Sequence, residues 1–177
     1  MGVFKRIIAD LPPAKRSFPD IILNFFFNHP FKLLINIRLG QRFSKSPNPF
    51  LRFYSRILKN RQMYKWSCDI SYDIIIGKRV VFGHPVGIVI GNKTIIEDDV
   101  RIWQNVTLGS HGKQGEVKKY PIIKRRAKLY AGCKIIGGVT VGENAVVGAN
   151  SVVNIDVPAN SVAVGIPCKI FQKRNNE

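Results

Sequence analysis

The sequence predicts a mainly β protein: a parallel β-helix of hexapeptide repeats, preceded by a short basic α-helical segment. Three observations lead to this prediction. Apolar residues return at every sixth position between residues 70 and 166, the period breaks between Leu108 and Ile123, and positive charge is concentrated in the first 66 residues. A period of six matches neither a helix face nor a single long strand. It is typical of short strands stacked on successive coils.

The repeat is clearest in its second half. There the recurring apolar positions are Ile123, Leu129, Ile135, Val141, Val147, Val153 and Ala159, each followed four residues later by a small or β-branched residue. In the first half they are Ile70, Ile76 and Phe82, then Ile90, Ile96, Ile102 and Leu108 after a two-residue slip at Ile88–Val89. So many hexads in register argue against a run of unrelated short strands.

The interruption of the period predicts a loop over 109–122 that leaves the coil. This stretch holds three glycines, three lysines and His111. Binding residues concentrate on loops that a rigid scaffold holds, so we expect this loop to take part in function. The predicted organisation is a helical segment over 1–66, a β-helix domain over 67–170 and a polar tail over 171–177.

The N-terminal segment is the basic part of a chain whose net charge is +17. Residues 1–66 contain 13 Lys and Arg against Asp10 and Asp20. We expect 1–16 to be a loosely structured lead-in with one helical turn, 20–28 an apolar patch that Pro30 interrupts, and 31–43 a helix. Asn48–Pro49 has the form of an N-cap and first position of a further helix. No run reaches the roughly 18–20 apolar residues that a spanning helix needs.

The last of these helices is expected to be amphipathic. Its apolar residues are Phe50, Phe53, Tyr54, Ile57 and Leu58, and its basic residues are Arg52, Arg56, Lys59 and Arg61. This pattern fits a helix lying on an anionic membrane surface. It also fits a helix packed on the β-helix or on a neighbouring subunit, and both can hold at once. A nucleic-acid partner is not expected, because the aromatic residues lie on apolar helix faces rather than on a stacking platform.

The three cysteines, Cys68, Cys133 and Cys168, form no C-x-x-C pair and are expected to be reduced. We therefore expect a cytoplasmic protein, which the basic segment could hold on the inner face of the membrane. No apolar stretch with a cleavage site follows Met1, so no signal peptide is expected. No metal site is expected.

His84 is the candidate general base. It lies just before the two-residue slip, where a side chain can be aimed outward, whereas His29 precedes a proline and His111 lies in the loop. An imidazole is the usual base for a hydroxyl proton near neutral pH, and a carboxylate on its other nitrogen orients it. Asp69 lies 15 residues earlier. A triangular coil takes about 18 residues, so the pair can meet across a corner.

Five segments together resemble the serine acetyltransferase family: Cys68-Asp-Ile, Gly83-His-Pro-Val-Gly-Ile-Val-Ile-Gly91, Ile102-Trp-Gln-Asn-Val-Thr-Leu-Gly109, Gly148-Ala-Asn-Ser-Val-Val153 and Val164-Gly-Ile-Pro-Cys-Lys169. The resemblance implies a left-handed β-helix, a rare exception to right-handed crossovers. It also implies a homotrimer that binds acetyl-CoA between subunits, without a metal.

The resemblance also assigns site residues. Asp69 and His84 fall on the catalytic pair, Ser110, Ala131 and Ala149 on the pantetheine contacts, and Lys169 near the CoA phosphates. Gly109 and His111 are included among the cofactor-binding candidates, with a backbone N–H near Gly109 facing the oxyanion. Trp103, Lys119 and Tyr120 are the candidates for acceptor binding.

Several residues differ from the pattern of the family, and these differences determine which substrate we expect. Lys119-Tyr120 stands where the family has Arg-His, and Gly83 stands where an Asp precedes the catalytic histidine. With these differences and its short basic N-terminal segment, the chain resembles the branch of the family that O-acetylates sugars of capsular, exo- or lipopolysaccharides. We therefore expect an acetyl-CoA-dependent O-acetyltransferase acting on a sugar hydroxyl.

Two alternatives stay open. One is a serine O-acetyltransferase of cysteine synthesis, which Lys119 disfavours because a bidentate grip on a carboxylate favours Arg. The other is a non-enzymatic β-helix scaffold, which the Asp69 and His84 pair disfavours.

Overall fold

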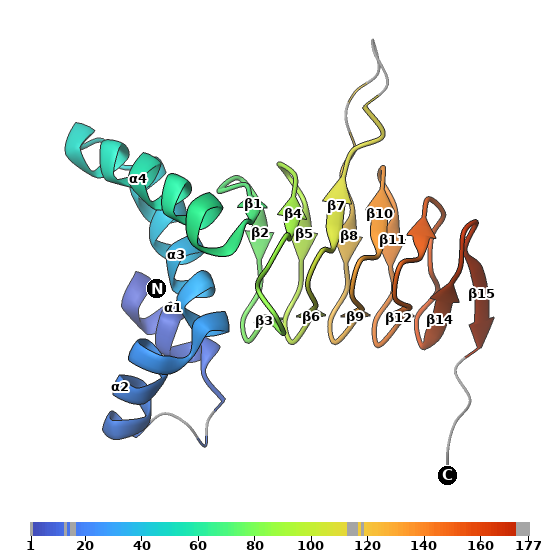
Figure 1. The fold of residues 1–177 in the computed structure, drawn as a ribbon, viewed down its shortest axis with the longest axis horizontal. Coiled ribbons are helices and arrows are strands. Elements are labelled where there is room, and N and C mark those ends of the chain that lie inside the picture. The colour runs from blue at the N-terminus through green and yellow to red at the C-terminus, as the bar shows by residue number, and fades with distance from the viewer. Residues whose placement is uncertain (1, 13, 15–16, 113–116, 118, 173–177) are drawn as a thin grey trace.

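The computed structural model describes residues 2–12, 14, 17–112, 117 and 119–172. In these residues four helices come first: α1 (Val3–Asp10), α2 (Phe18–Phe27), α3 (His29–Ser44) and α4 (Pro49–Trp66). The strands that follow are β1 (Asp69–Ile70), β2 (Ile75–Ile76), β3 (Val81–Phe82), β4 (Val89–Ile90), β5 (Ile95–Ile96), β6 (Arg101–Ile102), β7 (Thr107–Gly109), β8 (Ile122–Ile123), β9 (Lys128–Leu129), β10 (Lys134–Ile136), β11 (Thr140–Val141), β12 (Val146–Val147), β13 (Val152–Val153), β14 (Ser161–Val164) and β15 (Lys169–Gln172). Figure 1 shows the helices gathered at one end of an elongated stack of strands.

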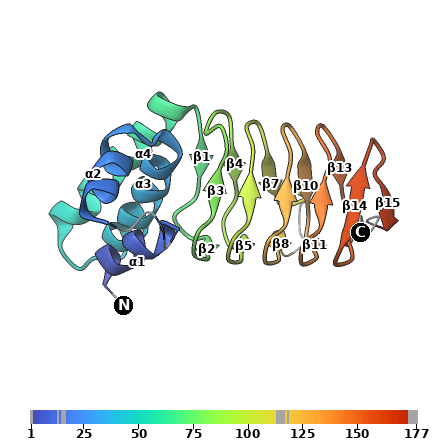
Figure 2. The ribbon, with the colours of Figure 1, turned by 90° about the horizontal axis from the view of Figure 1, so that it is seen from below.

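The strands form three sheets along a prism, which confirms the predicted parallel β-helix. The sheets have the orders β1-β4-β7-β10-β13, β11-β8-β5-β2 and β15-β14-β12-β9-β6-β3. The strands from β1 to β14 pair in parallel with strands of neighbouring coils, as β4 does with β7. Figure 2 shows the same stack seen from below, with the helices covering its first coil.

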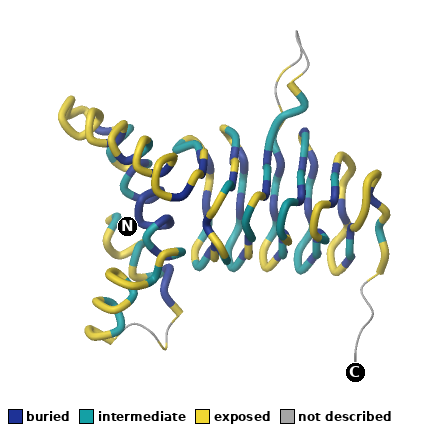
Figure 3. Tube along the Cα trace, in the orientation of Figure 1, coloured by how far each residue is buried: buried dark blue, intermediate teal, exposed yellow. Residues whose placement is uncertain are grey.

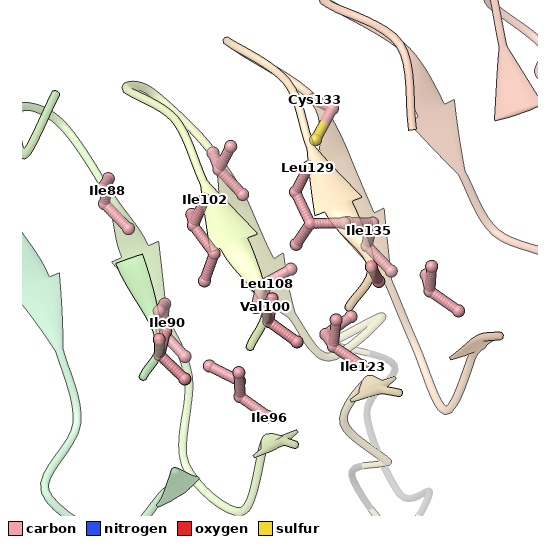
Figure 4. Packing of buried hydrophobic residues seen from close by; sticks show 14 of the residues in the cluster. Ile88, Ile90, Ile96, Val100, Ile102, Leu108, Ile123, Leu129, Cys133 and Ile135 are labelled. Carbon is pink, nitrogen blue, oxygen red and sulfur yellow. The ribbon is translucent and has the colours of Figure 1, made fainter. Parts of the chain in front are cut away.

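The core of the prism is a column of apolar side chains from the hexad positions. Ile90, Ile96, Ile102, Leu108 and Ile123 are fully buried, and their side chains lie in the interior between the strands (Figure 4). Burying each such side chain contributes roughly 1.5–3 kcal/mol, so the repeated hexads supply most of the stabilisation of this domain.

The coil lengths confirm both irregularities that the sequence predicts. Asp69 pairs with Val89 across the first coil, whereas Val89 pairs with Thr107 across the next, so the first coil holds two extra residues. The two extra residues lie in the corner between β3 and β4. Thr107 then pairs with Lys134, because the loop that leaves the coil after β7 adds nine residues to that turn. Residues 113–116 and 118 of this loop lie outside the described part.

The C-terminal end differs from the prediction. The hexad pattern ends beyond Ile166–Pro167 as predicted, but the polar tail predicted over 171–177 does not begin at residue 171. Instead β15 turns back and pairs antiparallel with β14, matching Val164 with Lys169 and Ser161 with Gln172. This strand hydrogen-bonds to the free edge of the last coil, which a parallel stack would otherwise expose. Residues 173–177 lie outside the described part.

The helical segment is organised around α3. It packs against α4, against α1 and α2, and against the first coil at β3. Asn28 accepts a hydrogen bond from the backbone N–H of Phe31 at 3.0 Å, so Pro30 begins α3 rather than only interrupting an apolar patch. The predicted cap at Asn48 is confirmed, since its side chain accepts from the N–H of Phe50 at 2.9 Å.

The prediction of a loosely structured lead-in over 1–16 is wrong for its first part, because Val3–Asp10 forms the helix α1. A buried ion pair joins this helix to α3: Arg38 donates from Nε and Nη2 to the two carboxylate oxygens of Asp10, each at 3.0 Å. Arg38 also donates to the carbonyl oxygen of Ile76 at 2.8 Å, and the N–H of Arg79 donates to Asp10 at 3.0 Å. Arg38 is thus an internal anchor that joins two helices to the first coil.

Much of the helical segment stays exposed. Figure 3 shows long exposed stretches on α2 and α4, whereas the coils of the β domain alternate between buried and exposed residues. Among the described residues, no helix combines the length and the apolar character needed to cross a membrane.

Candidate active site

His84 lies in the enlarged corner between β3 and β4. Pro85 behind it is buried, and the carbonyl oxygen of His84 accepts from the N–H of Val86 at 2.8 Å, so the backbone turns sharply there. The imidazole is exposed and has no hydrogen-bond or ion-pair partner among the described residues. Both ring nitrogens are therefore open to a ligand, as the role of a general base requires.

Asp69, the expected partner of His84, has a different partner in this structure. Lys59 of α4 donates from Nζ to Oδ1 of Asp69 at 2.7 Å and to the carbonyl oxygen of Ile70 at 2.7 Å. No hydrogen bond between Asp69 and His84 occurs in the described part of the chain. Their pairing stays a prediction, and Lys59 is a neighbour of the site that the sequence placed only on a basic helix face.

Several predicted residues share the edge between the β3 sheet and the β4 sheet. Phe82, Ile102, Leu129 and Val147 are paired in successive coils, so the residues after them lie in a row. The row directly after these strands is Gly83, Trp103, Tyr130 and Gly148, and the next contains His84, Ala131 and Ala149. Lys169, which pairs with Val164 at the end of β14, is exposed at the same edge. The structure therefore aligns His84, Trp103, Ala131, Ala149 and Lys169 along one edge, spread over successive coils from the first to the last.

The other predicted residues lie on the opposite edge of the β4 sheet, where the loop leaves the coil. Gly109 and Ser110 begin this loop, and the ring of His111 lies near Gly137. At its end Lys119 packs closely on Gly138, and Tyr120 packs so closely on Gly91 that a methyl group there would lie 2.6 Å from its ring. In a single chain these residues are separated from His84 by the width of a sheet.

An aromatic pair lies directly beside His84. The rings of Trp103 and Tyr130 stack with centroids 4.6 Å apart and planes inclined by 23°. A Cβ atom at Gly83 would lie 3.1 Å from the indole of Trp103, which explains why a larger side chain is absent before His84. Tyr130 is not recognisable as a site residue in the sequence, because its alignment with Trp103 depends on the inserted loop. Gln104 is not recognisable either; its Oε1 is buried on this edge without a partner among the described residues.

A cavity of about 450 Å³ opens beside Asp69, between α4 and the first two coils. It carries both signs of charge: Arg56 and Lys59 on one wall, and Asp69 and Asp73 on the other. Arg56 is exposed and has no ion-pair partner among the described residues. Gly91, on which Tyr120 packs, also lines this cavity, so it lies next to the base of the loop.

The cysteines provide no nucleophile. All three are free and buried. Burial raises the pKa of the Cys68 thiol, and it raises the pKa of Cys133 to about 12. Both thiols therefore stay protonated near neutral pH. In the described residues no group of three or more His, Cys, Asp or Glu side chains is placed to hold a metal ion.

Comparison with known proteins places the chain in a class. Residues 120–154 match the family described as bacterial transferase hexapeptide (six repeats). Together with the coiled fold, this match defines a hexapeptide-repeat transferase.

The relatives narrow the class to one family. The chain is 35% identical over 163 residues to the serine acetyltransferase of Bacillus pumilus (strain SAFR-032), covering 92% of this chain and 72% of that protein. It is 39% identical over 122 residues to that of Buchnera aphidicola subsp. Schizaphis graminum (strain Sg), covering 69% of this chain and 47% of the relative. A solved serine acetyltransferase in complex with CoA superposes with a TM-score of 0.79 at 28% identity, covering 96% of this chain and 69% of that one. The chain belongs to the serine acetyltransferase family of hexapeptide-repeat acyltransferases.

These findings confirm the family expected from the sequence, but they do not support its polysaccharide-acetylating branch. The chain spans about half the length of the Buchnera relative.

Proposed function

We propose that this protein is an acetyl-CoA-dependent O-acetyltransferase in which His84 is the general base. The observation that carries the proposal is the exposed, unpartnered imidazole of His84 on an edge that continues with Ala131, Ala149 and Lys169. The two alanines leave room for a narrow chain such as pantetheine, and the lysine supplies a cation for the CoA phosphates. A family member has been solved with CoA, which supports this assignment.

The reaction needs one proton carrier and no covalent enzyme intermediate. His84 takes the proton of the acceptor hydroxyl as its oxygen bonds to the thioester carbon. The carbon–sulfur bond then breaks, and the imidazolium returns the proton to the departing CoA thiolate. Asp69 would orient the ring by accepting from its second nitrogen, and an N–H near Gly109 would stabilise the developing oxyanion.

The assembly proposed for this reaction is a homotrimer. His84 with the alanine row and Ser110 with Tyr120 lie on opposite edges of one sheet, so a groove lined by both groups requires two copies of the chain. We infer that acetyl-CoA binds in this groove between subunits. Sedimentation equilibrium at micromolar concentration tests the assembly, because a fully active monomer would contradict the shared site.

L-serine is the acceptor that the findings favour. The relatives carry the name serine acetyltransferase. The cavity beside Asp69 supports this choice, because serine is a zwitterion and binds best where the protein offers a group of each charge. Arg56 can pair with the carboxylate of serine, and Asp73 can pair with its ammonium group. The sequence favoured a sugar over serine because Lys119 replaces an arginine, but it did not foresee Arg56 at this place.

A sugar hydroxyl is the second candidate, and the stacked Trp103 and Tyr130 support it. An aromatic surface next to the base suits the apolar face of a pyranose ring, and Gly83 leaves space for that stack. On this proposal the acceptor would lie along the edge of His84 rather than in the cavity beside Asp69.

One assay separates the two acceptors. Release of the CoA thiol is followed with L-serine, nucleotide sugars and purified polysaccharides, using the native chain, Arg56→Met and Trp103→Ala. If serine is the substrate, Arg56→Met raises KM for serine about tenfold or more, since it removes a charge-assisted contact, and Trp103→Ala matters less. If a sugar is the substrate, Trp103→Ala should raise KM for that sugar more than Arg56→Met does. No thiol release with any acceptor would contradict the proposed activity.

A further inference from the structure

The helical segment presents an apolar surface that the described part of the chain leaves uncovered. Phe18 and Phe27 at the ends of α2 are 76% and 74% exposed, and Phe50 and Phe53 at the start of α4 are 81% and 62% exposed. Phe25, Phe26, Tyr54 and Ile57 are exposed as well, and we call these eight residues of α2 and α4 the aromatic surface. Soluble monomers rarely leave so much apolar area in contact with water unless it has a partner.

A cavity of about 340 Å³ joins the two halves of this surface. It lies between α2, α3 and α4, and its apolar walls are Phe25, Phe26, Ile35, Leu39, Tyr54 and Leu58. This volume is in the range of small-molecule sites. The walls suit a hydrocarbon chain.

The polar groups of this cavity are donors. Lys32 and Arg61 line it, and no carboxylate does. Lys32 donates to the carbonyl oxygen of Phe26, and the exposed guanidinium of Arg61 has no ion-pair partner among the described residues. Trp66, which is 5% exposed and lines the same cavity, buries its Nε1 donor without an acceptor. Arg61 is therefore the group that an anionic occupant could pair with, while its apolar body would lie along the walls.

We propose that the aromatic surface docks on an anionic phospholipid bilayer and that the cavity receives one phospholipid, with its phosphate near Arg61 and its chain along the apolar walls. Residues 1–66 hold 13 Lys and Arg against two acids, so the segment is complementary to an anionic surface. A second copy of the chain is a poorer occupant, since it would bring two strongly positive surfaces together. The proposal does not depend on the acceptor of the acetyl group.

The first test is co-sedimentation of the full chain with vesicles of phosphatidylcholine alone or with 30% phosphatidylglycerol. We expect binding to the anionic vesicles, little to the neutral ones, and weaker binding as salt screens the charges. Equal binding to both vesicles, or no binding to the anionic ones, would overturn the proposal.

Variants locate the contact. Removing one basic residue from the bilayer surface lowers partitioning about fivefold, and this is expected for Arg61→Gln. Phe53→Ser is expected to lower it about tenfold, because an aromatic side chain leaves the apolar phase. Arg101→Gln is the matched control, since this exposed arginine lies on β6 of the β-helix and should leave vesicle binding unchanged. Equal effects of Arg61→Gln and Arg101→Gln would contradict the assigned surface.

Trp66 reports occupancy of the cavity itself. The chain has two tryptophans, so Trp103→Phe leaves Trp66 as the only tryptophan, whose emission is followed with excitation that tyrosine does not absorb. Phosphatidylglycerol with brominated acyl chains should quench Trp66 in this variant, because a chain in the cavity lies against the indole. Vesicle binding without such quenching would exclude the cavity as a lipid site. Circular dichroism of each variant shows whether the helices are kept.

Discussion

Arg38 is predicted to hold the helical segment on the β-helix, and Arg38→Met tests this role. Both side chains of the pair are buried, with 1% exposure for Arg38 and none for Asp10. Methionine fills a similar volume but leaves the Asp10 carboxylate, among the described residues, with only the N–H of Arg79 as a partner. Removing one partner of a buried pair costs about 3–5 kcal/mol, a large share of the stability of a typical domain.

Equilibrium unfolding in urea, followed by circular dichroism, measures this cost. Lys59→Met is the matched control, because Lys59 and Asp69 are 30% and 58% exposed and such a pair contributes less than about 1 kcal/mol. The double variant Asp10→Leu/Arg38→Met should recover much of the loss, since no charge stays buried. A loss for Arg38→Met no larger than that for Lys59→Met would refute the reasoning.

Three further predictions concern the β-helix. Gly132→Ala should cost about 1–3 kcal/mol of unfolding free energy, because Gly132 has a φ of 71° and its Cβ would meet Asn150; the thermal melting temperature measures this loss. Arg79 lowers the pKa of Asp99 through a side-chain hydrogen bond. The pair therefore adds to the unfolding free energy above the ordinary pKa of 3.8, and this contribution is lost as the pH falls through the lowered pKa of the folded state. Asp99→Asn should remove this pH dependence of the unfolding free energy. The thiol of Cys133, whose pKa is raised to about 12, should resist iodoacetamide at pH 8 until the protein unfolds, as mass spectrometry would show.

The fold was largely predictable because one column of side chains determines it. Ile90, Ile102 and Leu129 face the interior whatever lies outside the prism, so their spacing alone gives the coil and locates the loop. The cap at Asn48 was equally local. Such features depend on neighbouring residues or on a fixed period, both of which are visible in a sequence.

The features that sequence analysis missed depend on contacts between distant segments. Nothing in the sequence marks Arg38 as buried, but Asp10, 28 residues away, pairs with it inside the protein. Lys59 reaches Asp69 only because α4 lies along the first coil. Tyr130 meets Trp103 because the loop returns the chain to the same edge. Charge pairs and stacks of this kind have no period to reveal them.

The most direct test of the account is the turnover of His84→Ala. Thiol release from acetyl-CoA is measured with the acceptor that the assay of serine, nucleotide sugars and polysaccharides identifies. The affinity for CoA is measured in parallel by calorimetry. The account predicts a fall in kcat of roughly 10²–10⁴-fold with little change in CoA affinity, because the variant removes the base and leaves the alanine row and Lys169 in place. Turnover that survives in His84→Ala but is lost in His111→Ala would show that His84 is not the base.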